Sequence, residues 1–176
     1  MVWIASSGPL AANAYGFNFV SIPQTFTHLQ LRVTARGATG TAVEELMYSR
    51  PNNDTSTSNY RTHYLYGNGS SVFSGDYGTG RNYSLYQWIA GNGASSNVFG
   101  TIIIDVLDYA NTNKNKTIRS IAGIDNNGSG DVSLTSNLWI NTAAITSFEI
   151  GGFGVNLAAG SRIDLYGITT SQVTGA

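Results

Sequence analysis

Two carboxylates interrupt an apolar stretch in the middle of the chain. Asp105 and Asp108 lie within residues 102–109. Hydrolysis of a polysaccharide needs two carboxylates that face each other across the scissile bond. Polar residues at strand ends more often bond to nearby backbone groups. We therefore favour a structural role, in which Asp105 and Asp108, with Tyr109 and Asn111, offer side-chain acceptors to loop amides.

Oxygen-bearing side chains alternate along residues 125–131, a pattern that matches the first half of a calcium-binding loop. The bidentate glutamate that closes such a loop is missing, because Ser136 occupies its position. Asn126, Asn127 and Gly128 tolerate positive φ angles. We predict a hairpin turn here, and no metal or cofactor.

The two histidines, His28 and His63, fall on the outward phases of predicted strands. Neither has the spacing of a metal site or a catalytic triad. His63 is flanked by Arg61 and by tyrosines, so a recognition surface is the alternative to an ordinary polar sheet face. We favour the sheet face, and we predict no catalytic residue in this chain.

Three tyrosines, Tyr60, Tyr64 and Tyr66, share one phase of a predicted strand. Aromatic rings can stack on sugars, but they equally fill sandwich cores and subunit interfaces. Core or interface is the favoured interpretation, and all three are candidate interface residues.

The two chain ends are further candidates for an interface. Met1, Val2, Trp3 and Ile4 are mostly apolar, and residues 169–176 are mostly small or polar. Short ends of this kind often become ordered only when they dock on a partner. Deletion of either end is expected to leave folding intact and to weaken binding.

Alternation of apolar and polar residues is the dominant pattern and predicts half-buried antiparallel strands. It is clearest at residues 27–36, where Leu29, Leu31, Val33 and Ala35 share one side. Similar runs occur at residues 15–22, 59–66, 84–89, 98–107, 117–124, 132–140, 145–150 and 162–168. Short strands at this spacing are typical of a sandwich or a barrel.

We predict an all-β fold, an antiparallel β-sandwich of jelly-roll type with long polar loops. It forms a single domain over residues 1–176, with residues 1–12 as an N-terminal arm or edge strand and 169–176 as a C-terminal tail. Residues 50–59 and 72–81 are predicted to be long exposed loops, because they are rich in polar residues and glycine. Single helical turns are expected near residues 41–47 and 142–145.

The composition narrows the choice of function. Only 11% of the 176 residues are charged, and the net charge of -1 offers no basic field for nucleic acid. Cysteine is absent, which excludes disulfides and thiolate sites, and no run of 18 apolar residues indicates a membrane span. A weakly charged surface is common in proteins that are buried against partners, so assembly is the leading expectation.

Several blocks of the sequence, in order along the chain, resemble small β-rich virion proteins of tailed bacteriophages. They are IPQTFTHLQLR at residues 22–32, YGNGS at 66–70, SNVFG at 96–100, IDVLDYANT at 104–112, LWINTAAI at 138–145 and SRIDLYGI at 161–168. The resemblance implies a virion, tail or decoration protein that is made in the host cytoplasm and located in the virion. It implies no catalytic residues.

From these observations the expected function is that of a capsid decoration or cement protein, which binds the major capsid protein on the outer head surface. A homo-oligomer, specifically a trimer, would match the symmetry of capsid junctions. The alternative is a tail fibre or baseplate component whose loops touch host glycans. A third class, a polysaccharide depolymerase, would require a groove lined by paired acids.

Overall fold

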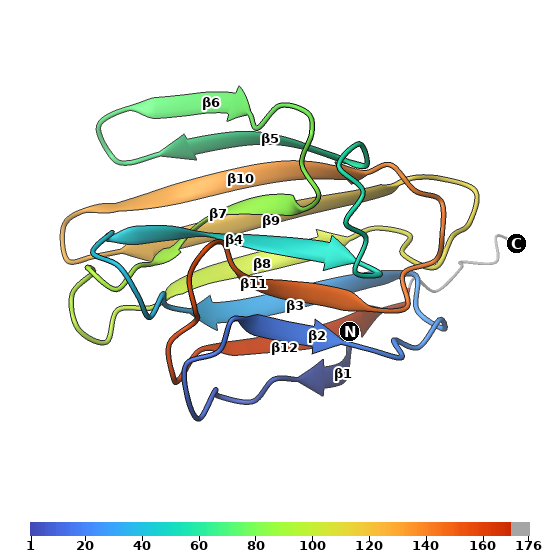
Figure 1. Ribbon diagram of the computed structural model, residues 1–176, viewed down its shortest axis with the longest axis horizontal. Coiled ribbons are helices and arrows are strands. Elements are labelled where there is room, and N and C mark those ends of the chain that lie inside the picture. Colours follow the sequence, from blue (N-terminus) through green and yellow to red (C-terminus); the bar gives the residue numbers. More distant parts are fainter. Residues whose placement is uncertain (170–176) are drawn as a thin grey trace, which may run out of the picture.

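The computed structural model describes residues 1–169, without the side chain of Gln87, as two antiparallel sheets packed in a sandwich. The strands are β1 (Val2–Ser6), β2 (Gly16–Phe19), β3 (His28–Ala35), β4 (Glu44–Pro51), β5 (Tyr60–Gly67), β6 (Val72–Asp76), β7 (Ser84–Ala90), β8 (Gly100–Val106), β9 (Lys116–Asp125), β10 (Gly130–Trp139), β11 (Phe148–Gly152) and β12 (Arg162–Ile168). The large sheet has eight strands in the order β1-β12-β3-β8-β9-β10-β5-β6, and the small sheet has four in the order β2-β11-β4-β7 (Figure 1). The predicted all-β sandwich is confirmed.

Eight of these strands, β1 to β4, β7, β8, β11 and β12, follow the jelly-roll topology. Consecutive strands of this set alternate between two four-stranded layers, except β4 and β7, which pair within the small sheet. Strand β12 lies between β1 and β3 in the large sheet, and β11 lies between β2 and β4 in the small sheet. Two hairpins, β5–β6 and β9–β10, are inserted into this plan and extend the large sheet beyond β8. Strand β7 covers part of the extension, and Figure 1 shows the β5–β6 hairpin projecting past the small sheet.

All nine predicted strands are present, and the N-terminal segment forms an edge strand, β1. The predicted helical turn at residues 41–47 is wrong, and so is the start of the predicted loop at 50–59, because the chain forms β4 there. This strand lies between β11 and β7, and Met47, Tyr48 and Ser49 are all buried. A strand buried on both faces has no alternating pattern to detect.

Two further predictions of local structure are wrong. The loop predicted at residues 72–81 contains β6, an edge strand that pairs with β5 from His63↔Asp76 to Gly67↔Val72. Most of β6 is exposed, so backbone pairing rather than burial defines it. The helical turn predicted at residues 142–145 is extended, and Ile145 donates its N–H to the carbonyl of Tyr109 at 2.9 Å. Of the predicted C-terminal tail, residues 170–176 lie outside the described residues.

The main apolar core lies between the two sheets and includes Leu31 and Ile104 from the large sheet and Met47 and Ile150 from the small sheet. Trp139 is fully buried at the end of β10. In the part of the chain that is described, no helix is long and apolar enough to cross a membrane.

Asp54 fixes the loop between β4 and β5 over this end of the core. Its carboxylate accepts hydrogen bonds from the indole Nε1 of Trp139, the backbone N–H of Ser56 and the amide of Asn59, each at 2.8 Å. Partial burial of the carboxyl opposes its ionisation, but the hydrogen bonds outweigh this effect and lower the pKa of Asp54 to about 2.

Two cations hold long connections through backbone carbonyls. The ammonium of Lys116, which is fully buried, donates to the carbonyls of Asn111, Lys114 and Thr142 at 2.7, 2.9 and 3.0 Å. Burial lowers the pKa of Lys116. The Arg36 guanidinium holds the connection between β7 and β8. Its acceptors are the carbonyls of Asn92, Ala94, Ser95 and Val98, at 2.8 to 3.0 Å.

Candidate docking face

Strand β10, which lies in the extension of the jelly roll, has an inverted pattern, with polar side chains inside and apolar side chains outside. On β10, Ser133, Thr135 and Asn137 are buried between the sheets, whereas Val132 and Leu134 point outward and are exposed. Amphipathic alternation alone would place the valine and leucine inside. Trp139 shares the phase of the buried polar residues, and its burial is one reason why the strand takes this phase.

The polar interior is stabilised by hydrogen bonds between side chains. Ser120 and Thr135 bond at 2.6 Å across β9 and β10, and Thr62 donates to the Oδ1 of Asn137. The Nδ2 of Asn137 donates to the carbonyl of Leu85 on β7 at 3.2 Å, which ties the extension to the small sheet. A buried polar group is tolerated when it is bonded in this way, so these hydrogen bonds offset much of the cost of burying Thr135 and Asn137.

The outward apolar residues form a continuous row across four neighbouring strands. Register pairs Ile103 of β8 with Ile121 of β9, Ile121 with Leu134 of β10, and Leu134 with Leu65 of β5. Their exposed fractions are 40%, 49%, 51% and 43%, and Val132 beside them is 64% exposed. We call these five residues the apolar face. A contiguous exposed apolar patch on a soluble domain marks an interaction site.

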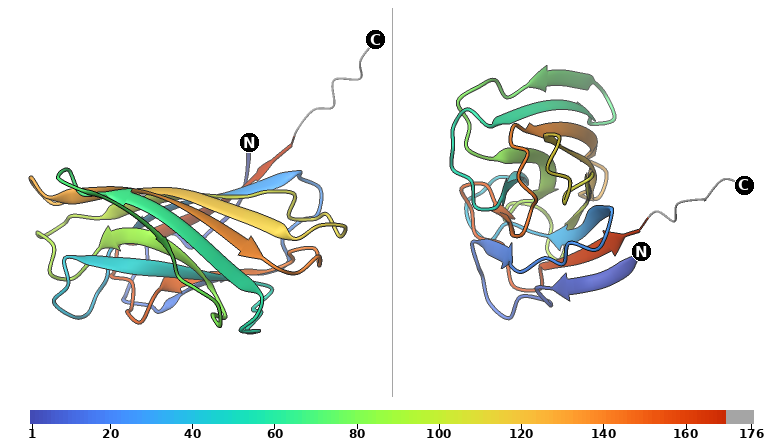
Figure 2. Two further views of the ribbon diagram at one scale, coloured as in Figure 1. Left: turned by 90° about the horizontal axis from the view of Figure 1, so that it is seen from above. Right: turned by 90° about the vertical axis from the view of Figure 1, so that its right-hand side faces the viewer.

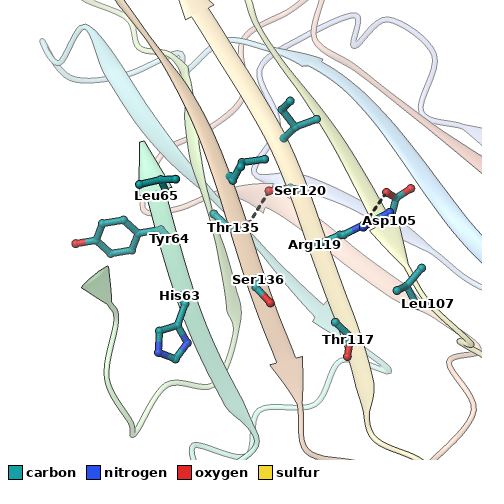
Figure 3. A pocket seen from close by; sticks show the side chains of 12 residues that line it. His63, Tyr64, Leu65, Asp105, Leu107, Thr117, Arg119, Ser120, Thr135 and Ser136 are labelled. Carbon is teal, nitrogen blue, oxygen red and sulfur yellow. Dashed lines mark hydrogen bonds and ion pairs between the residues drawn. The ribbon is translucent and has the colours of Figure 1, made fainter. Parts of the chain in front are cut away.

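Polar and charged residues border the apolar face on one side. The carboxylate of Asp105 accepts from Arg119 Nε at 3.3 Å and from Gln30 Nε2 at 3.0 Å. Figure 3 shows this ion pair on β8 and β9, across β10 from Leu65 and His63 on β5. These residues line a depression of about 770 Å³ in the outward surface of the four strands. An apolar centre with a polar rim is the usual anatomy of a protein interface.

The structure assigns the two aspartates a role different from the one predicted. Asp105 bonds the side chains named above, and Asp108 bonds the ammonium of Lys114 and lies 3.5 Å from the Nδ1 of His28. The hydrogen bond from Lys114 is the main reason why the pKa of Asp108 is lowered. The partners of these carboxylates are side chains of neighbouring segments rather than loop amides. Asn111 does accept a loop amide, that of Asn113, at 2.8 Å.

The histidines differ in their surroundings. His63 is exposed on the outward side of β5, as predicted. His28 is half-buried, and its Nδ1 accepts the backbone N–H of Asp108 at 2.9 Å. It therefore fixes the loop after β8 rather than contributing to a polar face.

The segment at residues 125–131 is the predicted hairpin turn. Asn127 and Gly128 have φ angles of 58° and 103°, and the N–H of Asn126 bonds the carbonyl of Ser129 at 2.7 Å. Positive φ at both central residues is the type I′ turn that joins two antiparallel strands. Asp131 is buried in the sandwich, while Asp125 is exposed and accepts the N–H of Asn127, so the two carboxylates do not converge on an ion.

The predicted interface residues do not form one surface. Met1, just before the edge strand β1, and Val2 and Trp3 on it are exposed, while Ile4 packs against the core. Tyr60 is buried, so its assignment to an interface is wrong; its hydroxyl donates to the Asp54 carbonyl at 2.7 Å.

Tyr64 and Tyr66 lie near the opposite edge of the large sheet from β1. They are half-buried in an aromatic cluster with Phe73, Tyr77 and Trp88, in which ring centroids are 4.8 to 6.0 Å apart. Sequence reasoning missed the apolar face. One signal was present in the sequence of β10. Leu134 and Trp139 point to opposite faces of this strand, so the burial of Trp139 exposes Leu134.

A pair of carboxyl groups lies between the sheets near the β9–β10 turn. Burial, together with the neighbouring carboxyl of Asp131, raises the pKa of Glu44 to about 7. Unfolded protein ionises this group near pH 4.5. Its contribution to stability is therefore complete below about pH 4.5 and is lost as the pH rises through about 7.

We expect the free energy of unfolding to be about 1–2 kcal/mol lower at pH 8.5 than at pH 5, a value reduced to allow for the partial exposure of Glu44. Urea titrations at both pH values measure this difference. Glu44→Gln should remove most of it. Burial also raises the pKa of Glu45, so Glu45→Gln should remove a smaller part. Equal pH dependence in the wild type and Glu44→Gln would contradict the assignment.

Comparison of this chain with known protein families, with curated proteins and with solved structures finds no match.

Proposed function

We propose that this protein is a non-enzymatic structural component of a tailed-phage particle, a decoration protein that binds the outer surface of the head. The observation that carries the proposal is the apolar face, a row of exposed apolar residues held in register on β8, β9, β10 and β5. The resemblance of the sequence blocks to virion proteins and the low content of charged residues support the same proposal.

The proposed partner of the apolar face is the major capsid protein. The eight strands of the large sheet are separated by seven inter-strand spacings of about 4.8 Å, and the strands are about seven residues long. The outward side of this sheet therefore has an area of about 800 Å². One partner in a standard stable interface contributes about the same area, about 800 Å². A homotrimer would present three such faces to a capsid junction, and simultaneous binding would strengthen attachment without new contacts.

Ile121→Asp and Leu134→Asp test the docking role of the apolar face. Each puts a charge at the centre of the face without touching the core, so the free energy of unfolding should change by less than about 0.5 kcal/mol. Binding to particles that lack the protein should fall at least tenfold in a co-sedimentation assay, because a desolvated and unpaired carboxylate is unfavourable.

The matched control is Val20→Asp, which places the same charge on an exposed apolar residue outside the apolar face. It should bind particles like the wild type. Undiminished occupancy by both face variants would overturn the docking role. Gold labelling on intact particles locates the protein, and label confined to the tail would replace the head proposal with the tail-associated alternative.

A further inference from the structure

The outward side of the small sheet contains a groove. The two sheets form the two layers of the sandwich (Figure 2), so this groove lies on the opposite side of the molecule from the apolar face. Gly16 of β2 and Gly151 of β11 are directly paired. A Cβ at Gly16 would lie 2.4 Å from the carbonyl oxygen of Ile150, so close backbone packing requires glycine there. Gly16 also lines the groove, and it has no side chain that would fill it.

Aromatic rings stand at one side of this groove. The Tyr15 side chain is 52% exposed, and its ring centroid lies 5.7 Å from that of Tyr48 at an interplanar angle of 48°. Tyr48 itself is buried, so it supports Tyr15 from behind instead of contacting solvent. An exposed ring held by a buried one is a rigid platform for the apolar face of a ligand ring.

The polar groups of the groove lie in one row across the strands, where Glu149 pairs with Asn18 on β2 and Arg50 on β4. The hydroxyl of Tyr48 donates to Glu149 Oε1 at 2.5 Å, and Arg50 lies 3.3 Å from Glu149 Oε2. Burial, and then the carboxylate of Glu149, raise the pKa of Tyr48, so the phenol remains a neutral donor. Arg50 balances the charge of Glu149, and the groove therefore does not select a charged ligand.

A loop residue completes the rim. Asn53 lines the groove together with Thr55, and both are exposed. Asn52 and Asn53 both adopt left-handed φ angles, 51° and 52°. Asn52 is fixed there by hydrogen bonds between its side chain and the loop before β11, including one to the Ala144 carbonyl at 2.9 Å. Asn53 follows this fixed residue, and its amide offers a donor and an acceptor to a ligand.

We infer that this groove, which we call the tyrosine groove, binds a neutral sugar ring. The pyranose would stack its C–H face on Tyr15, while its hydroxyls bond the amides of Asn18 and Asn53 and the carboxylate of Glu149. The groove has a volume of about 390 Å³, within the range of small-molecule sites. It lies on the layer opposite the apolar face, so a protein attached to a particle through that face would present the groove outward.

Saturation-transfer NMR on the full chain, with the methyl glycosides of glucose, galactose and mannose as probes, tests the inference. We expect transfer to ring protons of at least one probe at millimolar concentration. Tyr15→Ala should reduce affinity for that probe at least tenfold. Asn53→Gly, which keeps a residue suited to positive φ, should weaken binding without loss of stability.

Two controls separate this site from other surfaces. Trp3→Ala removes another exposed aromatic ring, on β1, and should leave sugar binding unchanged. Ile121→Asp should also retain sugar binding, so that a failure of the docking proposal is distinguishable from a failure of this one. The absence of saturation transfer with all three probes, or equal affinity in the wild type and Tyr15→Ala, would overturn the inference.

Discussion

Replacement of Lys116 by methionine is expected to lower the free energy of unfolding by about 2–4 kcal/mol. Methionine fills a similar volume, so the loss reflects hydrogen bonding rather than packing. The three carbonyl groups that accept from the Lys116 ammonium belong to the loop before β9 and to the segment after β10. Without the ammonium, these carbonyl groups would have to reach water or remain without a hydrogen-bond donor in a buried position. Chemical denaturation followed by tryptophan fluorescence measures the effect.

Lys114→Met is the matched control for this prediction. Lys114 is more than half exposed and pairs with Asp108 at the surface, so its removal should cost less than about 1 kcal/mol. A Lys116→Met variant as stable as Lys114→Met would show that the ammonium does not hold these segments together.

Loss of the Arg36 guanidinium is the second large effect. Arg36→Ala should lower the free energy of unfolding by about 2–3 kcal/mol, because hydrogen bonds from a charged donor to four carbonyls are lost together. Arg36→Lys should recover only part of this, since one ammonium cannot reproduce the planar fork. Amide hydrogen exchange should accelerate chiefly in residues 92–98, the connection that Arg36 holds.

Arg162→Ala provides the comparison for an arginine on the surface. Arg162 pairs with Asp164 on its own strand, so its removal should change stability by less than about 0.5 kcal/mol. If Arg36→Ala destabilises no more than Arg162→Ala, and exchange in residues 92–98 is unchanged, the carbonyl contacts of Arg36 contribute little.

The two surfaces of this sandwich have different chemistry. One outward side has an apolar row suited to burial against another protein, and the other has a groove with an exposed tyrosine. Both depend on strand phase, since the same backbone with each strand shifted by one residue would exchange inside and outside. The function proposed here thus depends on the phase in which β10 and its neighbours enter the sandwich.

The sequence alone determined the strands that have one solvent-exposed face and one buried face. Alternation at residues 27–36 placed Leu29, Leu31 and Val33 inside, and the structure buries all three. The turn at Asn126 to Gly128 was equally predictable, because positive φ angles require residues of this kind. Local chemistry is sufficient in both cases.

Tertiary structure decided the rest. Strand β4 gives no alternating signal because its consecutive residues Met47, Tyr48 and Ser49 are all buried. Edge strand β6 is defined by pairing with β5 rather than by its own residues. On β10 the apolar pattern indicates the wrong inward face, because the burial of Trp139 and the bonds of Asn137 and Thr135 across the sandwich are long-range interactions. The apolar face and the tyrosine groove each combine residues from strands far apart in the chain, and no local pattern specifies their meeting.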